Sequence, residues 1–287
     1  MVVWRSLKFY LEFKLSWKEQ SWFAIFKFYG RYSSIANMSD RPIVPVLRLE
    51  GVSLQATIGA DYLLQDVSLE IQPGEKIGVV GASGAGKTSL LRLLNRLVSP
   101  SEGTIYVNGT LAKNFSPVRL RRKIVLVNQE SKLLGMRVDE ALSYPLRLQQ
   151  LPETEIRSRL DTWTNLLRIP AEWFAKTEVQ LSVGQRQLVA IARALILQPE
   201  VILLDEPTSA LDLGLSSHLL AVLDELNQTQ NLTIIMVNHQ LELIENFCDR
   251  LILLERGTIV KDVPATESNW YGLCQKMLQI QQRETDW

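Results

Sequence analysis

The chain has 287 residues, of which 46% are apolar and 22% charged, enough for one large α/β domain with a sizeable core. Lys plus Arg and Asp plus Glu each number 31, and this zero net charge argues against a general nucleic-acid binder. Cys248 and Cys274 fit neither a disulfide framework nor a zinc spacing, which favours a reducing compartment. No apolar run reaches about 18 residues, so we predict no transmembrane helix.

Residues 1–37 form a basic, aromatic extension with six Lys or Arg residues against two acids, Glu12 and Glu19. Charges interrupt each of its apolar stretches, so it is not a signal peptide. One interpretation is a helix lying at a membrane surface. The other is an extension, disordered or not translated, upstream of a product that starts at Met38. Poor segregation of the apolar residues to one helical face favours the second.

The regular pattern starts at residue 46 and has two parts. Residues 46–50 and 67–71 alternate apolar and polar, which is typical of half-buried antiparallel strands. After the turn at Pro73-Gly74, residues 76–81 read as a buried strand, and Leu90, Leu91, Leu94 and Leu97 follow at helical spacing.

Four later segments are apolar throughout, as parallel strands covered on both faces are. They are residues 124–127, 201–204, 232–237 and 251–254. Helical patterns at 189–197 and 216–226 separate the last of these strands, and residues 131–182 are mostly helical in pattern. This alternation predicts an α/β fold with a mostly parallel sheet, a small antiparallel β subdomain before it and a helical insertion at about 131–182. We expect one domain over 46–263 and a short tail over 264–287.

Residues 81–88, Gly-Ala-Ser-Gly-Ala-Gly-Lys-Thr, fit the P-loop pattern between a buried strand and an amphipathic helix. Glycines let the backbone amides turn toward phosphate oxygens, and the helix start adds its positive dipole end. Lys87 is expected to reach the β- and γ-phosphates, and the Thr88 hydroxyl to bind Mg²⁺. The candidate phosphate-binding residues are Gly81, Ala82, Ser83, Gly84, Ala85, Gly86, Lys87, Thr88 and Ser89.

Residues 201–206, Val-Ile-Leu-Leu-Asp-Glu, form an apolar strand that ends in two acids. Asp205 is expected to bind Mg²⁺ through water, beside the P-loop. Glu206 is placed to orient the attacking water and to accept its proton as general base. The second acid favours hydrolysis over nucleotide binding alone.

Residues 181–185, Leu-Ser-Val-Gly-Gln, resemble the LSGGQ signature that defines the ATP-binding cassette (ABC) family, with Val183 in place of the first glycine. The resemblance implies that Ser182, Gly184 and Gln185, at a helix N-terminus, contact the γ-phosphate of ATP held by an opposite subunit. A hydroxyl, a bare backbone amide and a helix dipole all favour an anion. The implied fold is that of a P-loop NTPase with a RecA-like sheet, an ABC ATPase.

Further positions match the family in order from about residue 46 to 263. Gln129 resembles the Q-loop glutamine, which senses Mg²⁺ and water and couples to a permease. Asp212, in Ser-Ala-Leu-Asp, resembles the end of the D-loop, which meets its counterpart across a dimer, and His239 resembles the switch histidine on the γ-phosphate. The family stacks adenine on an aromatic residue. The expected position holds the aliphatic Ile58, and Tyr62 is the alternative.

The resemblance implies an ATP-hydrolysing subunit, with Mg²⁺, of an ABC transporter. It would work as a homodimer or heterodimer beneath a separate membrane permease, at the cytoplasmic face of the membrane, without nucleic acid. Residues 130–144 would meet the permease, with Leu133, Leu134 and Met136 offering an apolar groove. The alternative is that these side chains pack inside the helical insertion.

The sequence argues against three other functions. Soluble ABC ATPases of DNA repair, chromosomes or ribosomes carry long coiled coils or two cassettes, and this chain has no long heptad run and one P-loop. A P-loop kinase or GTPase would leave the signature, Glu206 and His239 without a role, and no N-K-x-D guanine motif occurs. Glu206 and His239 also argue against a non-catalytic regulatory cassette.

Overall fold

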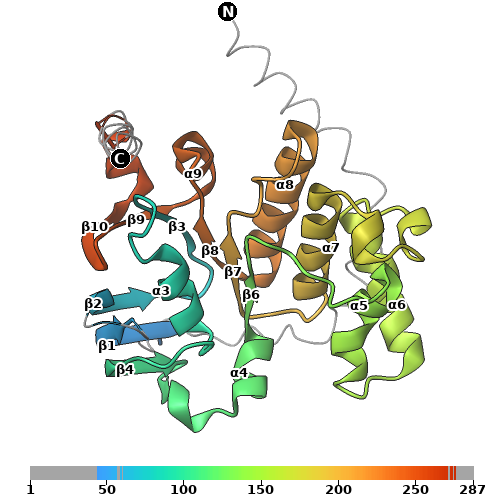
Figure 1. Ribbon diagram of the computed structural model, residues 1–287, viewed down its shortest axis with the longest axis horizontal. Coiled ribbons are helices and arrows are strands. Elements are labelled where there is room, and N and C mark those ends of the chain that lie inside the picture. The colour runs from blue at the N-terminus through green and yellow to red at the C-terminus, as the bar shows by residue number, and fades with distance from the viewer. Residues whose placement is uncertain (1–43, 57–58, 60, 271, 274, 276–287) are drawn as a thin grey trace, which may run out of the picture. The chain divides into compact units, whose positions relative to one another are not determined.

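The computed structural model describes residues 44–56, 59, 61–270, 272–273 and 275, which all belong to the unit Val44–Trp287 (Figure 1). The predictions for residues 1–37 and for most of the tail therefore lie outside the described residues. Among the helices of the described part, none is long and apolar enough to cross a membrane.

The first sheet has four strands in the order β2-β1-β4-β5, which are Tyr62–Ile71, Leu47–Gln55, Glu102–Val107 and Thr110–Leu111. All its pairings are antiparallel, and Leu47 lies opposite Ile71. The alternation of the sequence therefore predicted β1 and β2 correctly, although both strands run further than the pattern did.

The second sheet has six strands in the order β10-β9-β3-β8-β7-β6, which are Thr258–Pro264, Arg250–Glu255, Lys76–Val80, Thr233–Val237, Val201–Asp205 and Ile124–Val127. The pairings from β9 to β6 are parallel, and β10 joins β9 antiparallel. This confirms the predicted mostly parallel α/β fold.

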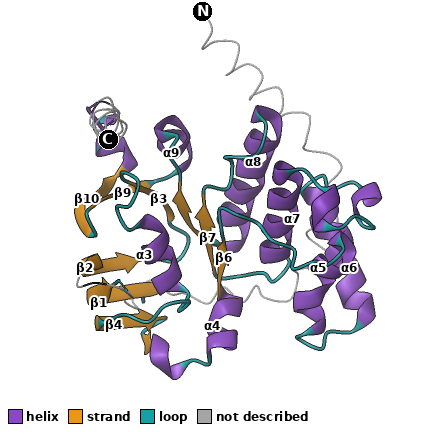
Figure 2. Cartoon of the chain, viewed as in Figure 1, coloured by secondary structure: helices purple, strands orange, loops and turns teal. Residues whose placement is uncertain are grey.

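The helices of the described residues follow the strands. They are α3 Lys87–Leu94, α4 Pro117–Lys123, α5 Val138–Arg147, α6 Glu153–Leu166, α7 Val183–Leu195, α8 Leu213–Gln230 and α9 Leu241–Phe247. Short 3-10 turns cover Ala112–Asn114, Ala171–Trp173, Glu178–Gln180 and Ala265–Glu267. Figure 2 shows α5 and α6 beyond α7, away from the strands, within the predicted helical insertion.

The continuous apolar runs of the large sheet fill two cores, because alternate residues point to opposite faces. One face packs with the antiparallel sheet and α3, and its strand residues include Ile77, Val79, Leu203, Ile235 and Leu254. The other packs with α5, α7, α8 and α9, and its strand residues include Val80, Ile202, Leu204, Met236 and Leu253. A parallel strand between two cores needs apolar residues at every position.

Helix α9 approaches β3 closely at Gly78. A Cβ atom at this position would lie 2.2 Å from Cγ2 of Ile244, so only glycine fits without movement. The nearby Cys248 is buried and free, and burial raises the pKa of its thiol. Cys248 is therefore a packing residue with little thiolate character.

One sequence expectation needs correction, and one alternative that the sequence left open is decided. Leu97 does not belong to α3, since the helix ends at Leu94, and the left-handed Arg96 (φ 54°) turns the chain so that Leu97 is 46% exposed. Leu133 does not line a surface groove, since it is fully buried in the core around α7. Leu134 is 71% exposed because it follows in a left-handed turn (φ 58°), while Met136 is partly buried against that core.

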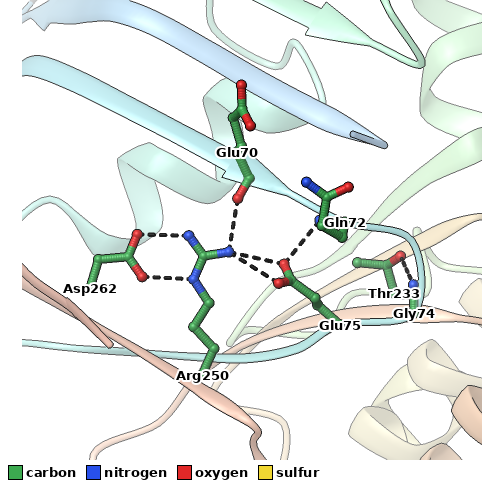
Figure 3. Close-up of polar contacts among 7 residues, drawn as sticks. All are labelled: Glu70, Gln72, Gly74, Glu75, Thr233, Arg250 and Asp262. Atoms are coloured by element: carbon green, nitrogen blue, oxygen red, sulfur yellow. Dashed lines mark hydrogen bonds and ion pairs between the residues drawn. The ribbon is translucent and has the colours of Figure 1, made fainter. Parts of the chain in front are cut away.

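Arg250 joins the two sheets. Its Nε and Nη2 each donate to a carboxylate oxygen of Asp262 in β10 at 2.7 Å (Figure 3). Its Nη1 donates to the Glu70 carbonyl in β2 at 2.8 Å and to Glu75 Oε2 at 3.0 Å. Hydrogen bonding to Asp262 raises the pKa of Arg250, with Glu75 adding to the effect against burial. One guanidinium thus fixes the antiparallel sheet against the edge of the large one.

Candidate active site

The sheet topology brings the predicted site residues to one edge. Strands β3, β8, β7 and β6 are parallel and adjacent, so their carboxyl ends lie side by side. The P-loop follows β3, Glu206 follows β7, His239 closely follows β8, and Gln129 follows β6. Ligands of open parallel sheets bind at this edge.

The P-loop turns tightly between β3 and α3. Gly86 is the N-cap residue of α3 with φ 102°, and a Cβ atom there would lie 2.6 Å from the Leu63 carbonyl oxygen. Glycine is therefore required both by the backbone angle and by the close approach of β2. The first turn of α3 holds no acid, so nothing there opposes an anion at the helix N-terminus.

Lys87 is the first residue of α3 and its side chain turns back over the loop. Its Nζ donates to the carbonyl oxygens of Gly81 at 2.8 Å and Ala82 at 2.7 Å. The residue is 7% exposed. The ammonium group is thus held against the first two residues of the loop.

Thr88 and Asp205 lie in direct contact. The Thr88 hydroxyl donates to Asp205 Oδ2 at 2.8 Å, and Asp205 is 4% exposed at the end of β7. A hydroxyl and a carboxylate are the hard oxygen donors that Mg²⁺ accepts. Within the described ranges no group of three or more His, Cys, Asp or Glu side chains forms a metal cage.

Glu206 lies between two other predicted residues. Its Oε1 is 2.8 Å from His239 Nε2, and its Oε2 accepts from Gln129 Nε2 at 2.9 Å. Its backbone is left-handed at φ 50°, a conformation that costs a non-glycine residue about 1 kcal/mol or more. Gln129 and His239, which are far apart in the sequence, therefore both contact the Glu206 carboxylate.

Two residues that sequence reasoning missed support this group. Asn238 Nδ2 donates to Thr208 Oγ1 at 2.9 Å, and Asn238 Oδ1 accepts from the Gln240 amide at 2.8 Å. Asn238 and Thr208 are 5% and 4% exposed. The bonds join the segment after Glu206 to the segment that carries His239. For Asn238, the available sequence signal was a polar residue directly after an apolar strand.

The signature residues begin α7 and pack against the D-loop of the same chain. Ser182 Oγ accepts from the Gln185 amide at 3.1 Å and Gln185 Oε1 accepts from the Ser182 amide at 2.9 Å, a capping box. A Cβ atom on Gly184 would lie 2.3 Å from the Ala210 carbonyl oxygen. Asp212 caps α8 by accepting from the Leu215 amide at 2.8 Å.

Tyr62 begins β2, next to Leu63, whose carbonyl contacts the P-loop. Its hydroxyl accepts from Gln55 Nε2 at 3.2 Å and donates to Glu102 Oε1 at 3.3 Å, and the residue is 36% exposed. These bonds hold the side chain within the antiparallel sheet, and its adenine contact stays a prediction. Ile58 lies outside the described residues.

The fold and the P-loop together define a protein of the ATP-binding cassette class. Residues 64–209, half of the chain, match the ABC transporter family, and the chain belongs to this family.

The methionine import ATP-binding protein MetN of Francisella tularensis subsp. holarctica (strain OSU18) is 39% identical over 206 residues. The match covers 70% of this chain and 59% of that protein, so the chain spans well under two thirds of this relative's length. MetN 2 of Pectobacterium atrosepticum is 38% identical over 76% of this chain and 66% of its own.

Two solved structures have the same fold. A dimeric ATP-binding cassette in a post-hydrolysis state, bound to ADP and Pi, gives a TM-score of 0.70 at 28% identity, covering 76% of this chain and 98% of its own. CbiO1 of Clostridium perfringens, part of the transporter complex cbiONQ, gives 0.69 at 28% identity, covering 78% and 90%.

Proposed function

We propose that this chain binds ATP with Mg²⁺, hydrolyses the ATP, and thereby energises an ABC transporter through closure of a dimer and coupling to a separate membrane permease. The observation that carries the proposal is the Glu206 carboxylate, placed between Gln129 and His239 at the edge that also holds the P-loop and Asp205. The MetN relatives are named as methionine import ATP-binding proteins, and one related cassette is bound to ADP and Pi.

ATP binding is assigned to the P-loop and α3. The loop amides and the helix N-terminus face the phosphates, and Lys87 exchanges its carbonyl partners, Gly81 and Ala82, for phosphate oxygens. Thr88 and Asp205 would hold Mg²⁺, whose charge neutralises the phosphates when it is bound.

Hydrolysis is assigned to Glu206. The carboxylate takes a proton from water as the water oxygen attacks the γ-phosphorus, the bond to the β-phosphate oxygen breaks, and ADP and phosphate leave. Gln129 and His239 orient the carboxylate from either side before nucleotide arrives.

A second copy, or a homologous subunit, would complete the site with its signature. The first turn of α7 holds no acid, and Val183 beside Ser182 is 60% exposed. Leu213, directly after the D-loop, is 89% exposed. An exposed apolar pair next to two helix N-termini suits a face that a partner covers while ATP lies between the subunits.

The permease contact is assigned to Leu134 and Val179, which are 71% and 89% exposed. The residues that precede them in the sequence are hydrogen-bonded, since the Leu133 amide donates to Glu178 Oε2 at 2.8 Å. The two segments that carry Leu134 and Val179 therefore lie next to each other. Through this contact the chain would lie at the cytoplasmic face of the membrane. We assign residues 46–263 as the ATPase domain and 131–182 as its helical subdomain.

The test uses Glu206→Gln in the purified full chain. Because the amide cannot accept a proton, ATP hydrolysis should fall about 100-fold or more while ATP still binds. The variant should then elute as a dimer when ATP and Mg²⁺ are present and as a monomer without them. Lys87→Ala serves as the control, since it should lose ATP binding and remain monomeric. Hydrolysis at the wild-type rate by Glu206→Gln would contradict the assignment of the base.

The transport role is tested separately. Tagged wild-type chain is purified from its own cells in mild detergent, and the accompanying proteins are identified by mass spectrometry. A multi-spanning membrane protein should accompany the wild type and be lost in the double variant Leu134→Asp, Val179→Asp. Purification with soluble partners alone would favour a non-transport ABC ATPase instead.

A further inference from the structure

We propose that Gln187 and Arg193 of α7 are positioning residues that hold the segment after Gln129 to the signature helix. A movement of this helix would then shift the Gln129 side chain relative to the Glu206 carboxylate. The proposal rests on the proposed function. Ser131, Lys132 and Leu133 make three hydrogen bonds, to Gln187 and Arg193 of α7 and to Glu178 in the turn before it. We call these three bonds the α7 tether.

Three successive residues are each held at a different point. The Ser131 hydroxyl donates to Gln187 Oε1, and the Lys132 carbonyl accepts from Arg193 Nη2 at 3.1 Å. The Leu133 amide donates to Glu178 Oε2 at 2.8 Å, in the 3-10 turn just before the signature. Two of these bonds go to α7 and one to the turn before it, so they favour movement of this loop together with both.

Gln187 is a destabilising residue at this buried position. It is 2% exposed on a helix whose other buried residues include Leu188, Val189 and Ile191, and its Nε2 is a buried donor with no hydrogen-bond partner in the described structure. An unsatisfied buried donor is destabilising, and an apolar side chain of similar shape would avoid that cost. The glutamine therefore reduces stability while it supplies the acceptor for Ser131.

Arg193 is similarly constrained. Burial lowers the pKa of its guanidinium, and the negative charge of the Glu178 carboxylate opposes the shift, so the charges of Arg193 and Glu178 attract each other. Arg186, directly after the signature, donates through Nη1 to the carbonyl of Leu181, the first signature residue, at 2.9 Å. Hydrogen bonds from α7 thus hold both the signature and the segment after Gln129.

The tether joins the two halves of the proposed reaction. One end is the capping box of Ser182 and Gln185, which would meet the partner's nucleotide. The other end is Gln129, whose Nε2 bonds the base Glu206 at 2.9 Å. When a γ-phosphate draws Ser182 toward it, the tether shifts Gln129 and changes how Glu206 is held. Loss of the tether should therefore lower kcat more than ATP affinity.

The experiment removes one tether bond from either end in the full chain. Gln187→Met removes the acceptor and Ser131→Ala removes the donor, and kcat and the ATP Kd are measured for each, for the pair, and for each in a Gln129→Ala background. Each single variant should lower kcat about 2- to 30-fold, with the Kd for ATP unchanged. The pair should lose no more than one variant alone, and in the Gln129→Ala background the loss should vanish.

Leu188→Met is the matched control, a volume-conserving change at the neighbouring buried position that should leave kcat unchanged. Gln187→Met should unfold at the same temperature as the wild type or higher. A Gln187→Met loss that persists in full without Gln129, or an unchanged kcat, overturns the tether alone. A wild type that hydrolyses no ATP overturns the proposed function and the tether together.

Discussion

Glu206 shows how one residue can be forced into an unfavourable conformation by its neighbours. Its amide donates to the Val237 carbonyl of β8 at 2.9 Å, and its own carbonyl accepts from Ser209 Oγ at 3.0 Å. These two bonds hold the left-handed backbone, which turns the chain out of β7 directly after Asp205. The carboxylate is then presented to Gln129 and His239 from a rigid strand end, which preorganises the proposed base.

Gly184 carries a prediction at the same scale. Gly184→Ala should destabilise the nucleotide-free chain by about 1–3 kcal/mol in urea unfolding, because the new Cβ would lie 2.3 Å from the Ala210 carbonyl oxygen. The matched control is Gly214→Ala in α8, where the Cβ would lie 3.3 Å from Asp212 Oδ1. Its stability should stay within about 1 kcal/mol of the wild type, since alanine favours a helix. Equal effects of the two changes would refute the packing argument.

At the scale of elements, α8 connects the core beside the large sheet to the end of α6. His218 of α8 is 5% exposed, and its Nε2 lies 2.8 Å from the Leu166 carbonyl oxygen at the last residue of α6. Burial lowers the pKa of His218, with the hydrogen bond to Leu166 opposing this and Arg168 adding to it. The imidazole is therefore neutral in the folded chain near pH 7.

This burial predicts acid sensitivity. The unfolded histidine takes up its proton as the pH falls through about 6.5, whereas the folded one takes it up only at lower pH. Stability is therefore full above pH 6.5 and falls below it until the folded pKa is reached. Urea unfolding between pH 7.5 and 5.5 should show a smaller loss for His218→Gln than for the wild type. His218→Leu should lose the same component, and a wild-type pH profile in both variants would exclude His218 as its source.

At the scale of the molecule, the large sheet separates two cores and Arg250 holds the antiparallel sheet to its edge (Figure 3). The salt bridges to Asp262 and Glu75 are partly buried, since 22% of the Arg250 side chain is exposed. Glu75 in turn accepts from the Gln72 amide at 2.9 Å. Arg250 and Glu75 therefore order the turn that leads from β2 into β3 and the P-loop.

Arg250→Met should destabilise the chain by about 2–3 kcal/mol, because Asp262 and Glu75 lose a charged donor. Arg250→Lys should recover only part of this, since an ammonium cannot make the paired bonds to Asp262. Thermal and urea unfolding of the three chains provide the measurement. The exposed ion pair Arg147–Glu153 is the control, and Arg147→Met should change stability by less than about 1 kcal/mol. A full recovery by lysine would show that charge alone matters.

Much of the fold could be predicted from local patterns. Alternation predicted β1 and β2, uniform apolar runs predicted β6, β7, β8 and β9, and the P-loop pattern predicted the start of α3 at Lys87. The error came where tertiary contacts override local spacing. Leu97 continues a helical period but follows a left-handed turn. For Leu133 the sequence left a surface groove and an interior position open, and only the packing around α7 shows that it is fully buried.

The sequence by itself determined which groups are present: a phosphate loop with Lys87, two acids after a strand, and a signature before a helix. Hydrophobic periodicity and glycine placement are local properties, and a single chain displays them directly. Only the tertiary structure decided that Gln129 and His239 meet on Glu206, that Gly184 packs against Ala210, and that Gln187 is joined to Ser131. These contacts join residues far apart in the sequence, so they depend on strand order and helix packing, which no local pattern contains.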